Sequence, residues 1–227
     1  DNLAMTLTLL EAVRAHAREA TVVAVGSGEV YGPPASLPVD ESAPLRPQNP
    51  YAISKASADL LAGFYADSHK LRLVRARPFN HSGPGQEPIY AIASVARQMA
   101  EGLVNGDDPV RIVTGNPDAR RDYTDVRDVV RAYLCLAEHG MSGEAYNISS
   151  GRPKSAGELV QALGEAAGVE VDHQVDPKLV RAHEVMEVRG SFDKLRAATG
   201  WEPRILLSRT LADTVAWWQA ELQSNRK

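Results

Sequence analysis

Short apolar runs typical of buried strands alternate along this chain with longer segments in which apolar residues recur at helical spacing. The runs expected to form strands cover residues 21–26, 71–77, 110–114, 145–148 and 169–175. Helices are expected over 2–18, 50–68, 90–104, 125–139 and 156–166 and near 192–198 and 208–222, with loops over 28–48, 78–89 and 115–124. Strands that alternate with helices predict an α/β fold with a mostly parallel sheet covered on both faces.

Tyr51 and Lys55 stand four residues apart at the start of the helix expected over 50–68. Asn49 is a favoured N-cap residue and Pro50 a favoured first helical residue, so the phenol and the ammonium should share one face of the first turns. An adjacent cation lowers the pKa of an acid, and the pKa of an unperturbed Tyr is about 10. The pair therefore predicts a general acid or base near neutral pH, although the same spacing also occurs on ordinary surface helices.

The strand expected over 21–26 ends in small polar residues at 26–29. In open α/β sheets, the carboxyl end of a buried strand is where binding and catalytic sites are built. Ser27 is therefore expected to bond a substrate oxygen beside Tyr51. A hydrolase nucleophile elbow is excluded, because G-x-S-x-G would need glycines where Val25 and Glu29 stand.

These features resemble the extended short-chain dehydrogenase/reductase family of nucleotide-sugar enzymes, also called the NAD-dependent epimerase/dehydratase family. In that family, a Ser or Thr four residues before a Tyr-Gly pair joins a later Y-x-x-x-K motif in the catalytic set. Ser27, Tyr51 and Lys55 match these positions, and the segments 77–86 and 115–128 continue the match in the family's order. The resemblance implies a Rossmann-like doubly wound parallel sheet with a smaller C-terminal substrate domain.

The resemblance also implies a domain division. Residues 1–79 would form the C-terminal half of the dinucleotide-binding domain, and residues 80–227 would form the substrate-binding region interleaved with the remaining sheet elements. No Gly-rich dinucleotide fingerprint occurs, and the chain opens inside a helical pattern that contains Leu3, Leu7, Leu10 and Val13. We therefore expect the first part of the Rossmann domain to be absent from this chain, so the choice between NAD and NADP cannot be read from it.

The family's site residues map onto named positions of this sequence. The resemblance implies that the cofactor, NADP(H) or NAD(H), contacts Tyr51, Lys55, Pro78 and His81. It implies that a nucleotide-sugar substrate contacts Ser27, Asn80, Arg121, Arg181 and Glu184. Guanidinium groups suit diphosphate oxygens and a carboxylate suits ribose hydroxyls, which fits this division of roles.

Glu29 leaves two reactions open. In the family's 4,6-dehydratases a Glu at this position removes the C5 proton, so Glu29 is also a candidate catalytic residue. However, dTDP-glucose-type dehydratases place an Asp before that Glu, where this chain has Gly28, and GDP-mannose dehydratases have an arginine-containing loop where residues 82–86 contain none. The resemblance thus implies NAD(P)H-dependent reduction of the C4 keto group of a GDP-4-keto-6-deoxy-hexose to a GDP-rhamnose-type product.

Two alternatives to this reduction stay open. One is a GDP-mannose 4,6-dehydratase or another nucleotide-sugar epimerase or dehydratase. The other is a non-catalytic member that binds sugar nucleotides. Since helices 2–18 and 50–68 resemble the family's dimer bundle, a homodimer is expected.

Composition narrows the remaining classes. A hydrophobic content of 44% and a charged content of 24% are ordinary for a globular protein, and a net charge of −4 argues against nucleic acid as a partner. No apolar run approaches the roughly 18 residues of a membrane span, and the first residues show no basic region followed by an apolar core as in a signal peptide, so a cytoplasmic location is expected. The single cysteine, Cys135, excludes an internal disulfide and is expected in the core, and no residues have metal-ligand spacing.

Overall fold

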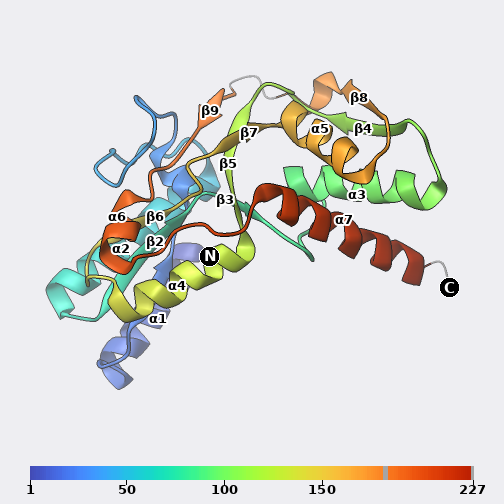
Figure 1. The fold of residues 1–227 in the computed structure, drawn as a ribbon. Helices are drawn as coiled ribbons and strands as arrows, with labels where there is room; N and C mark the ends of the chain where they lie inside the picture. Colours follow the sequence, from blue (N-terminus) through green and yellow to red (C-terminus); the bar gives the residue numbers. More distant parts are fainter. Residues whose placement is uncertain (181–183, 226–227) are drawn as a thin grey trace. The chain divides into compact units, whose positions relative to one another are not determined.

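The computed structural model describes residues 1–180 and 184–225, and the chain divides into two compact units (Figure 1). Unit 1 consists of residues 1–80, 128–151 and 188–203. Unit 2 consists of the described residues of 81–127, 152–187 and 204–227. The sequence-based division expected residues 80–227 to interleave substrate-binding segments with further sheet elements, and in the structure residues 128–151 and 188–203 belong to unit 1.

Unit 1 is built on a parallel three-stranded sheet in the order β1-β2-β6. The strands are β1 (Val22–Val25), β2 (Leu73–Pro78) and β6 (Ala145–Ile148). Val25 lies opposite Ala76, and Pro78 lies opposite Ile148. The three carboxyl ends therefore meet at one edge of the sheet, where an α/β fold places its functional residues.

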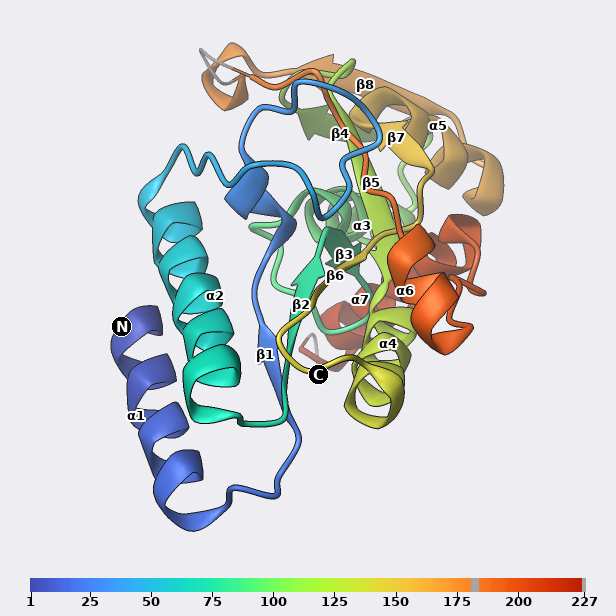
Figure 2. The same ribbon diagram turned by 90° about the vertical axis from the view of Figure 1, so that its left-hand side faces the viewer.

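Helices cover both faces of this sheet, with α1 (Asn2–His16) and α2 (Pro50–His69) on one side and α4 (Val126–His139) and α6 (Asp193–Thr199) on the other (Figure 2). Successive strand residues point to opposite faces. Ala24 and Leu73 accordingly pack in the cluster under α1 and α2, while Val74 and Ala76 pack in the cluster under α4 and α6. This arrangement confirms the predicted doubly wound α/β class.

The start of α2 follows its predicted capping chemistry. Asn49 Oδ1 accepts a hydrogen bond from Ala52 N at 2.8 Å, and Pro50 is the first helical residue. Between β1 and α2, the 3₁₀ helix η1 (Gly28–Tyr31) occupies part of the segment expected to be loop. In α1, Leu10 is buried, but Leu3 and Leu7 are each 44% exposed.

Unit 2 contains a sheet in the order β3-β5-β7, with β9 also pairing to β5, and a parallel pair of β4 and β8. Its strands are β3 (Asn80–Ser82), β4 (Val110–Thr114), β5 (Arg120–Asp125), β7 (Pro153–Ser155), β8 (Val171–Val175) and β9 (Glu187–Val188). Its helices are α3 (Ala91–Asn105), α5 (Ala156–Ala167), η2 (Pro177–Leu179) and α7 (Leu207–Ser224). One apolar cluster, which includes Met99, Ile112, Leu163 and Leu211, joins α3, β4, α5 and α7.

Strand β5 corrects the sequence-based prediction of a loop over 115–124. Its residues, Arg120 to Asp125, show no apolar alternation, which is the pattern that identifies a strand from sequence. The strand forms through its backbone, because Arg120 pairs with Ser155 and Asp122 with Pro153 in an antiparallel ladder with β7. The loop expected over 78–89 likewise contains β3.

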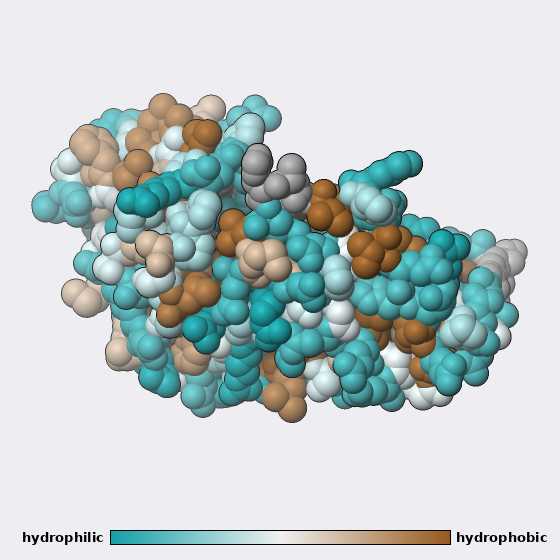
Figure 3. Space-filling model, turned by 90° about the horizontal axis from the view of Figure 1, so that it is seen from above, coloured by the Kyte–Doolittle hydropathy of each residue, from teal (hydrophilic) through white to brown (hydrophobic). Residues whose placement is uncertain are grey.

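The surface drawn in Figure 3 is mostly hydrophilic, with hydrophobic side chains in small groups. No helix among residues 1–180 and 184–225 is both long and apolar enough to cross a membrane. Cys135 is only partly buried, against the cluster under α4 and α6.

Candidate active site

Ser27 lies two residues beyond β1, at the carboxyl edge of the unit 1 sheet. It caps η1, and its Oγ accepts a hydrogen bond from Glu29 N at 3.2 Å. The residue is 9% exposed, so its position is set by the surrounding packing. A hydroxyl has one hydrogen to donate in addition to its lone pairs. Ser27 can therefore accept from η1 and still donate to another oxygen.

Tyr51 and Lys55 occupy the first turns of α2. Lys55 Nζ donates to the main-chain oxygen of Val25 at 3.1 Å and lies 6.0 Å from the centre of the Tyr51 ring. The first contact ties α2 to the last residue of β1, and the second keeps a cation over the face of the phenol. Tyr51 is 48% exposed, so solvent and small molecules can reach it.

Asn49 joins the start of α2 to η1. Its Oδ1 caps the helix, while its Nδ2 donates to Glu29 Oε2 at 3.1 Å. The oxygen of this amide group therefore caps the helix that carries Tyr51, and its nitrogen binds the Glu29 carboxylate. From sequence only the cap could be predicted, because the contact with Glu29 spans 20 residues and no local pattern signals it.

Pro78 ends β2 and is buried, and Asn80 lies exposed two residues further on. Between them, Phe79 lies against two glycines. A Cβ added at Gly28 would come within 3.0 Å of the Phe79 ring, and one added at Gly190 would come within 2.7 Å. Both distances are shorter than ordinary van der Waals contact, so a side chain at position 28 would require the Phe79 ring to shift by a few tenths of an ångström.

Arg121 and Glu184 come together in unit 2. Arg121 Nη2 donates to Glu184 Oε1 at 3.4 Å, and its Nη1 donates to Arg120 O at 2.9 Å. The two side chains are 18% and 15% exposed. Within the described part of the chain, Glu184 Oε2 is buried without a hydrogen-bond partner, and a carboxylate oxygen left in this way is well suited to a ligand hydroxyl.

The remaining predicted residues of unit 2 are less informative. His81 lies on β3, and its main-chain oxygen accepts from Gln86 Nε2 at 3.2 Å. Arg181 lies outside the described residues. Among the residues that are described, no group of three or more His, Cys, Asp or Glu side chains is arranged to hold a metal ion.

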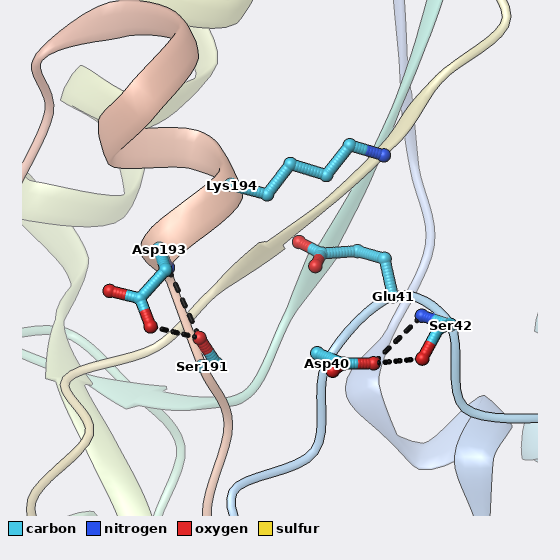
Figure 4. Close-up of a pocket in the computed structure, with 6 residues that line it drawn as sticks. All are labelled: Asp40, Glu41, Ser42, Ser191, Asp193 and Lys194. Carbon is cyan, nitrogen blue, oxygen red and sulfur yellow. Dashed lines mark hydrogen bonds between the residues drawn. The ribbon is translucent and has the colours of Figure 1, made fainter.

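A pocket of about 520 Å³ on unit 1 contains none of the predicted site residues (Figure 4). Its lining consists of three acidic residues, one lysine and two serines, namely Asp40, Glu41, Asp193, Lys194, Ser42 and Ser191. We take the carboxyl edge of the unit 1 sheet as the candidate site. The hydroxyl groups of Ser27 and Tyr51 and the ammonium of Lys55 are on the elements at this edge, and these groups can transfer protons or donate hydrogen bonds.

Comparison with known proteins identifies a matching family and similar enzymes. Residues 1–214 match the family described as GDP-mannose 4,6 dehydratase. The chain is 39% identical to GDP-6-deoxy-D-mannose reductase of Pseudomonas aeruginosa, over 98% of this chain and 73% of that protein.

Solved structures give the same result. The structure of RMD from Pseudomonas aeruginosa complexed with NADPH has a TM-score of 0.90 and 40% identity, and covers 97% of this chain and 73% of its own. A UDP-glucose 4-epimerase from Thermotoga maritima, solved with UDP-glucose, has a TM-score of 0.86 and 28% identity, and covers 97% of this chain and 70% of its own. The similarity therefore extends over nearly all of both units.

Proposed function

We propose that this chain, which belongs to the extended short-chain dehydrogenase/reductase family of nucleotide-sugar enzymes, reduces the C4 keto group of a GDP-4-keto-6-deoxy-hexose. The observation that carries the proposal is the arrangement at the sheet edge: Lys55 is bonded to the end of β1 and lies over Tyr51, and Ser27 follows β1 directly. The 39% identity to GDP-6-deoxy-D-mannose reductase supports the choice of substrate.

Tyr51 is the proposed proton donor. As the carbonyl carbon gains a hydride, the two π electrons of the C=O bond become a lone pair on oxygen, and the Tyr51 hydroxyl gives its proton to that oxygen. The product is a secondary alcohol, and the phenolate left behind regains a proton from water. Lys55 stabilises the phenolate, because a nearby cation favours the charged form of an acid.

Ser27 is proposed to orient the carbonyl. Its hydroxyl hydrogen remains available while its oxygen accepts from Glu29 N, so it can donate to the same substrate oxygen that receives the Tyr51 proton. Two donors aimed at one oxygen hold the carbonyl in a single orientation and stabilise the charge that develops on it.

The donor set at the sheet edge fits a reduced nicotinamide cofactor. An ammonium has three hydrogens, so the bond from Lys55 to Val25 O leaves donors for ribose hydroxyls. When bound, NADPH or NADH supplies the hydride for the carbonyl carbon. Pro78 and His81 are proposed as further contacts of this cofactor.

The nucleotide portion of the substrate is assigned to a second set of polar residues. Arg121 is proposed to bind the diphosphate, since its contact with Glu184 is long, at 3.4 Å, and can be exchanged for phosphate oxygens. Glu184 Oε2 is proposed to accept from a ribose hydroxyl. Asn80 and Arg181 are proposed as additional substrate contacts.

Gly28 and Glu29 favour reduction over dehydration. The acid that precedes the catalytic Glu in dTDP-glucose-type dehydratases is replaced by Gly28, where a Cβ would lie 3.0 Å from the Phe79 ring and would require that ring to shift. Glu29, the residue that would act as base at C5, has one carboxylate oxygen bonded to Asn49. We therefore assign Glu29 a positioning role.

A homodimer is the proposed assembly. Three apolar side chains on the outer face of α2, Ile53, Leu60 and Phe64, are 52%, 61% and 55% exposed and lie along one stripe of the helix. Met5 and Leu9 of the neighbouring α1 are 66% and 55% exposed (Figure 2). Pairing with the same surface of a second copy would remove these side chains from water. A cytoplasmic location stays a prediction from sequence.

The direct test is turnover by the full-length protein. With GDP-4-keto-6-deoxymannose and NADPH, we expect loss of reduced-nicotinamide absorbance and formation of one equivalent of the GDP-6-deoxy-hexose, measured by mass spectrometry. With GDP-mannose and NADP⁺, we expect no accumulation of a keto sugar. Formation of keto sugar would support the dehydratase instead, and binding of GDP-sugars without turnover of either substrate would support a non-catalytic member.

A further inference from the structure

A buried polar network runs through unit 1 underneath the candidate active site. It begins at Asp59 on α2, which accepts from Arg77 Nε at 3.0 Å and Nη2 at 2.7 Å and from Arg75 Nη1 at 2.9 Å. Asp59 is 3% exposed and Arg77 is 4% exposed. The two parallel bonds from Arg77 form a bidentate pair, which fixes orientation as well as distance.

The network continues from Arg77 to η1 and β6. Arg77 Nη1 donates to Tyr31 Oη at 2.8 Å, and the Tyr31 hydroxyl donates to Asn147 Oδ1 at 2.7 Å. The direction of these bonds is fixed, because a guanidinium can only donate and a phenol has one hydrogen. Burial raises the pKa of Tyr31 to about 12, so Tyr31 stays protonated and remains a donor throughout the neutral range.

The far end of the network is also anchored. Asn147 lies opposite Arg77 in the β2–β6 ladder, and its Nδ2 donates to Val39 O at 3.1 Å. Its main-chain N–H donates to Glu41 Oε1 at 2.6 Å, and Glu41 lines the pocket in Figure 4. Asn147 is fully buried. The network therefore has fixed partners on α2, β2 and β6.

Both elements that carry the candidate catalytic residues are attached to this network. Asp59 follows Lys55 by four residues and Tyr51 by eight, so all three lie along one side of α2. Tyr31 is the last residue of η1, and Ser27 is the cap of the same short helix. A single 3₁₀ turn does not hold itself in place, so its position depends on contacts such as the one made by Tyr31.

Stability alone does not account for a buried ion pair at this place, because well-packed apolar residues are often as stable. We propose that Asp59, Arg77, Tyr31 and Asn147, here called the positioning network, fix Ser27 relative to Tyr51 and Lys55. Tyr31 acts through η1 and touches no reacting atom, so it is a positioning residue. The inference rests on the proposed reduction for its kinetic consequence, but the structural link can be measured without it.

Tyr31→Phe is the primary test. The variant keeps the ring that stacks on Phe79, at 6.3 Å between centroids, and removes only the hydroxyl that joins Arg77 to Asn147. Tyr146→Phe is the matched control, since Tyr146 is 1% exposed in the same unit and its hydroxyl accepts from Met141 N, away from η1. Each variant loses one buried hydroxyl, but only Tyr31→Phe interrupts the network.

The first measurement is hydrogen exchange of η1 in the full-length protein. Val30 N donates to Ser27 O at 3.3 Å, and Gly32 N donates to Glu29 O at 3.1 Å. We expect these amides to exchange at least about 10-fold faster in Tyr31→Phe and at the parental rate in Tyr146→Phe. Unchanged exchange in Tyr31→Phe would overturn the proposal. This result does not depend on any substrate.

The second measurement is a double-mutant cycle with Ser27→Ala. We expect Tyr31→Phe to lower kcat for the keto sugar about 10- to 100-fold, with KM changed less than about threefold, and Tyr146→Phe to leave kcat unchanged. In the Ser27→Ala background, Tyr31→Phe should have no further effect, because the residue acts through Ser27. Effects that multiply would overturn the proposal.

Two further outcomes are an inactive parent protein and an unfolded Tyr31→Phe variant. If the parent does not reduce the keto sugar, the proposed function fails and hydrogen exchange alone decides whether the network holds η1. If circular dichroism shows that Tyr31→Phe is unfolded, Arg77→Lys replaces it. That variant keeps the cation beside Asp59 but loses the fork that reaches Tyr31, and it is judged by the same two measurements.

Discussion

Glu29→Gln changes the charge at the candidate site with little change in shape. The Glu29 side chain is exposed, and its hydrogen bond from Asn49 Nδ2, at 3.1 Å, can be accepted equally well by the amide oxygen of Gln. An exposed substitution of this kind alters stability by no more than about 0.5 kcal/mol. Any larger effect on turnover therefore reports on chemistry.

Dehydration and reduction require different roles of the Glu29 carboxylate. Dehydration needs a base to remove the C5 proton, and the loss of a general base lowers kcat by about 10²–10⁴, which is about 2.7–5.4 kcal/mol of activation free energy. Reduction removes no proton from carbon, so in a reductase Glu29→Gln would weaken only the contact that orients the sugar. For the proposed reductase we expect Glu29→Gln to lower kcat by less than about 10².

The assay measures both reactions in parallel on parent and variant, with keto sugar plus NADPH in one and GDP-mannose plus NADP⁺ in the other. Asn49→Asp serves as the orientation control, because an Asp oxygen still caps α2 but an ionised carboxylate has no hydrogen to donate to Glu29. If Glu29 only positions the sugar, the two variants should have similar, modest effects. Keto-sugar formation from GDP-mannose that Glu29→Gln abolishes would refute the reasoning.

Four further predictions concern single residues of the two units. Tyr51→Phe should lower kcat by about 10²–10⁴ with its fold intact by circular dichroism; near-parental turnover would exclude Tyr51 as the acid. Arg121→Ala should weaken GDP binding by about 1.5–3 kcal/mol in calorimetry, and an unchanged affinity would count against the diphosphate assignment. Leu60→Glu should convert the proposed dimer to a monomer in sedimentation, whereas a parental mass would place the interface elsewhere. The Ser155 backbone N–H and the Lys154 ammonium lower the pKa of Glu158 to about 2, so its contribution should be present above pH 4.5 and be lost as the pH falls toward 2. Urea unfolding should show a loss of about 1 kcal/mol, after solvent screening, that is missing in Glu158→Gln.

Local chemistry made part of the fold predictable. Asn49 and Pro50 mark the start of α2 by capping rules that need only adjacent residues, and the structure has both in these roles. Ser155 and Glu158 likewise form a capping box at the start of α5, with Ser155 Oγ accepting from Glu158 N at 3.1 Å. Capping can be predicted from sequence because the side chain and the backbone group that it binds lie within one helical turn.

Tertiary pairing accounts for what could not be predicted. Strand β5 is charged and polar in sequence and exists because its backbone pairs with β7. The contacts between Tyr31 and Asn147 and between Arg77 and Asp59 join residues 116 and 18 positions apart, and neither pair forms a sequence motif. The catalytic residues could be proposed from a family resemblance, but the network beneath them required the fold.

The position of Phe79 between two glycines limits how this chain can change its reaction. A Cβ at Gly28 or at Gly190 would meet the same ring, so each of the three positions restricts the other two. An acid at position 28 would require the Phe79 ring to shift by a few tenths of an ångström or to be replaced by a smaller side chain. An evolutionary or engineered route from this site to one with paired acids therefore has to displace or replace Phe79 as well, and a smaller residue 79 would leave a cavity under η1 that lowers the stability of the protein.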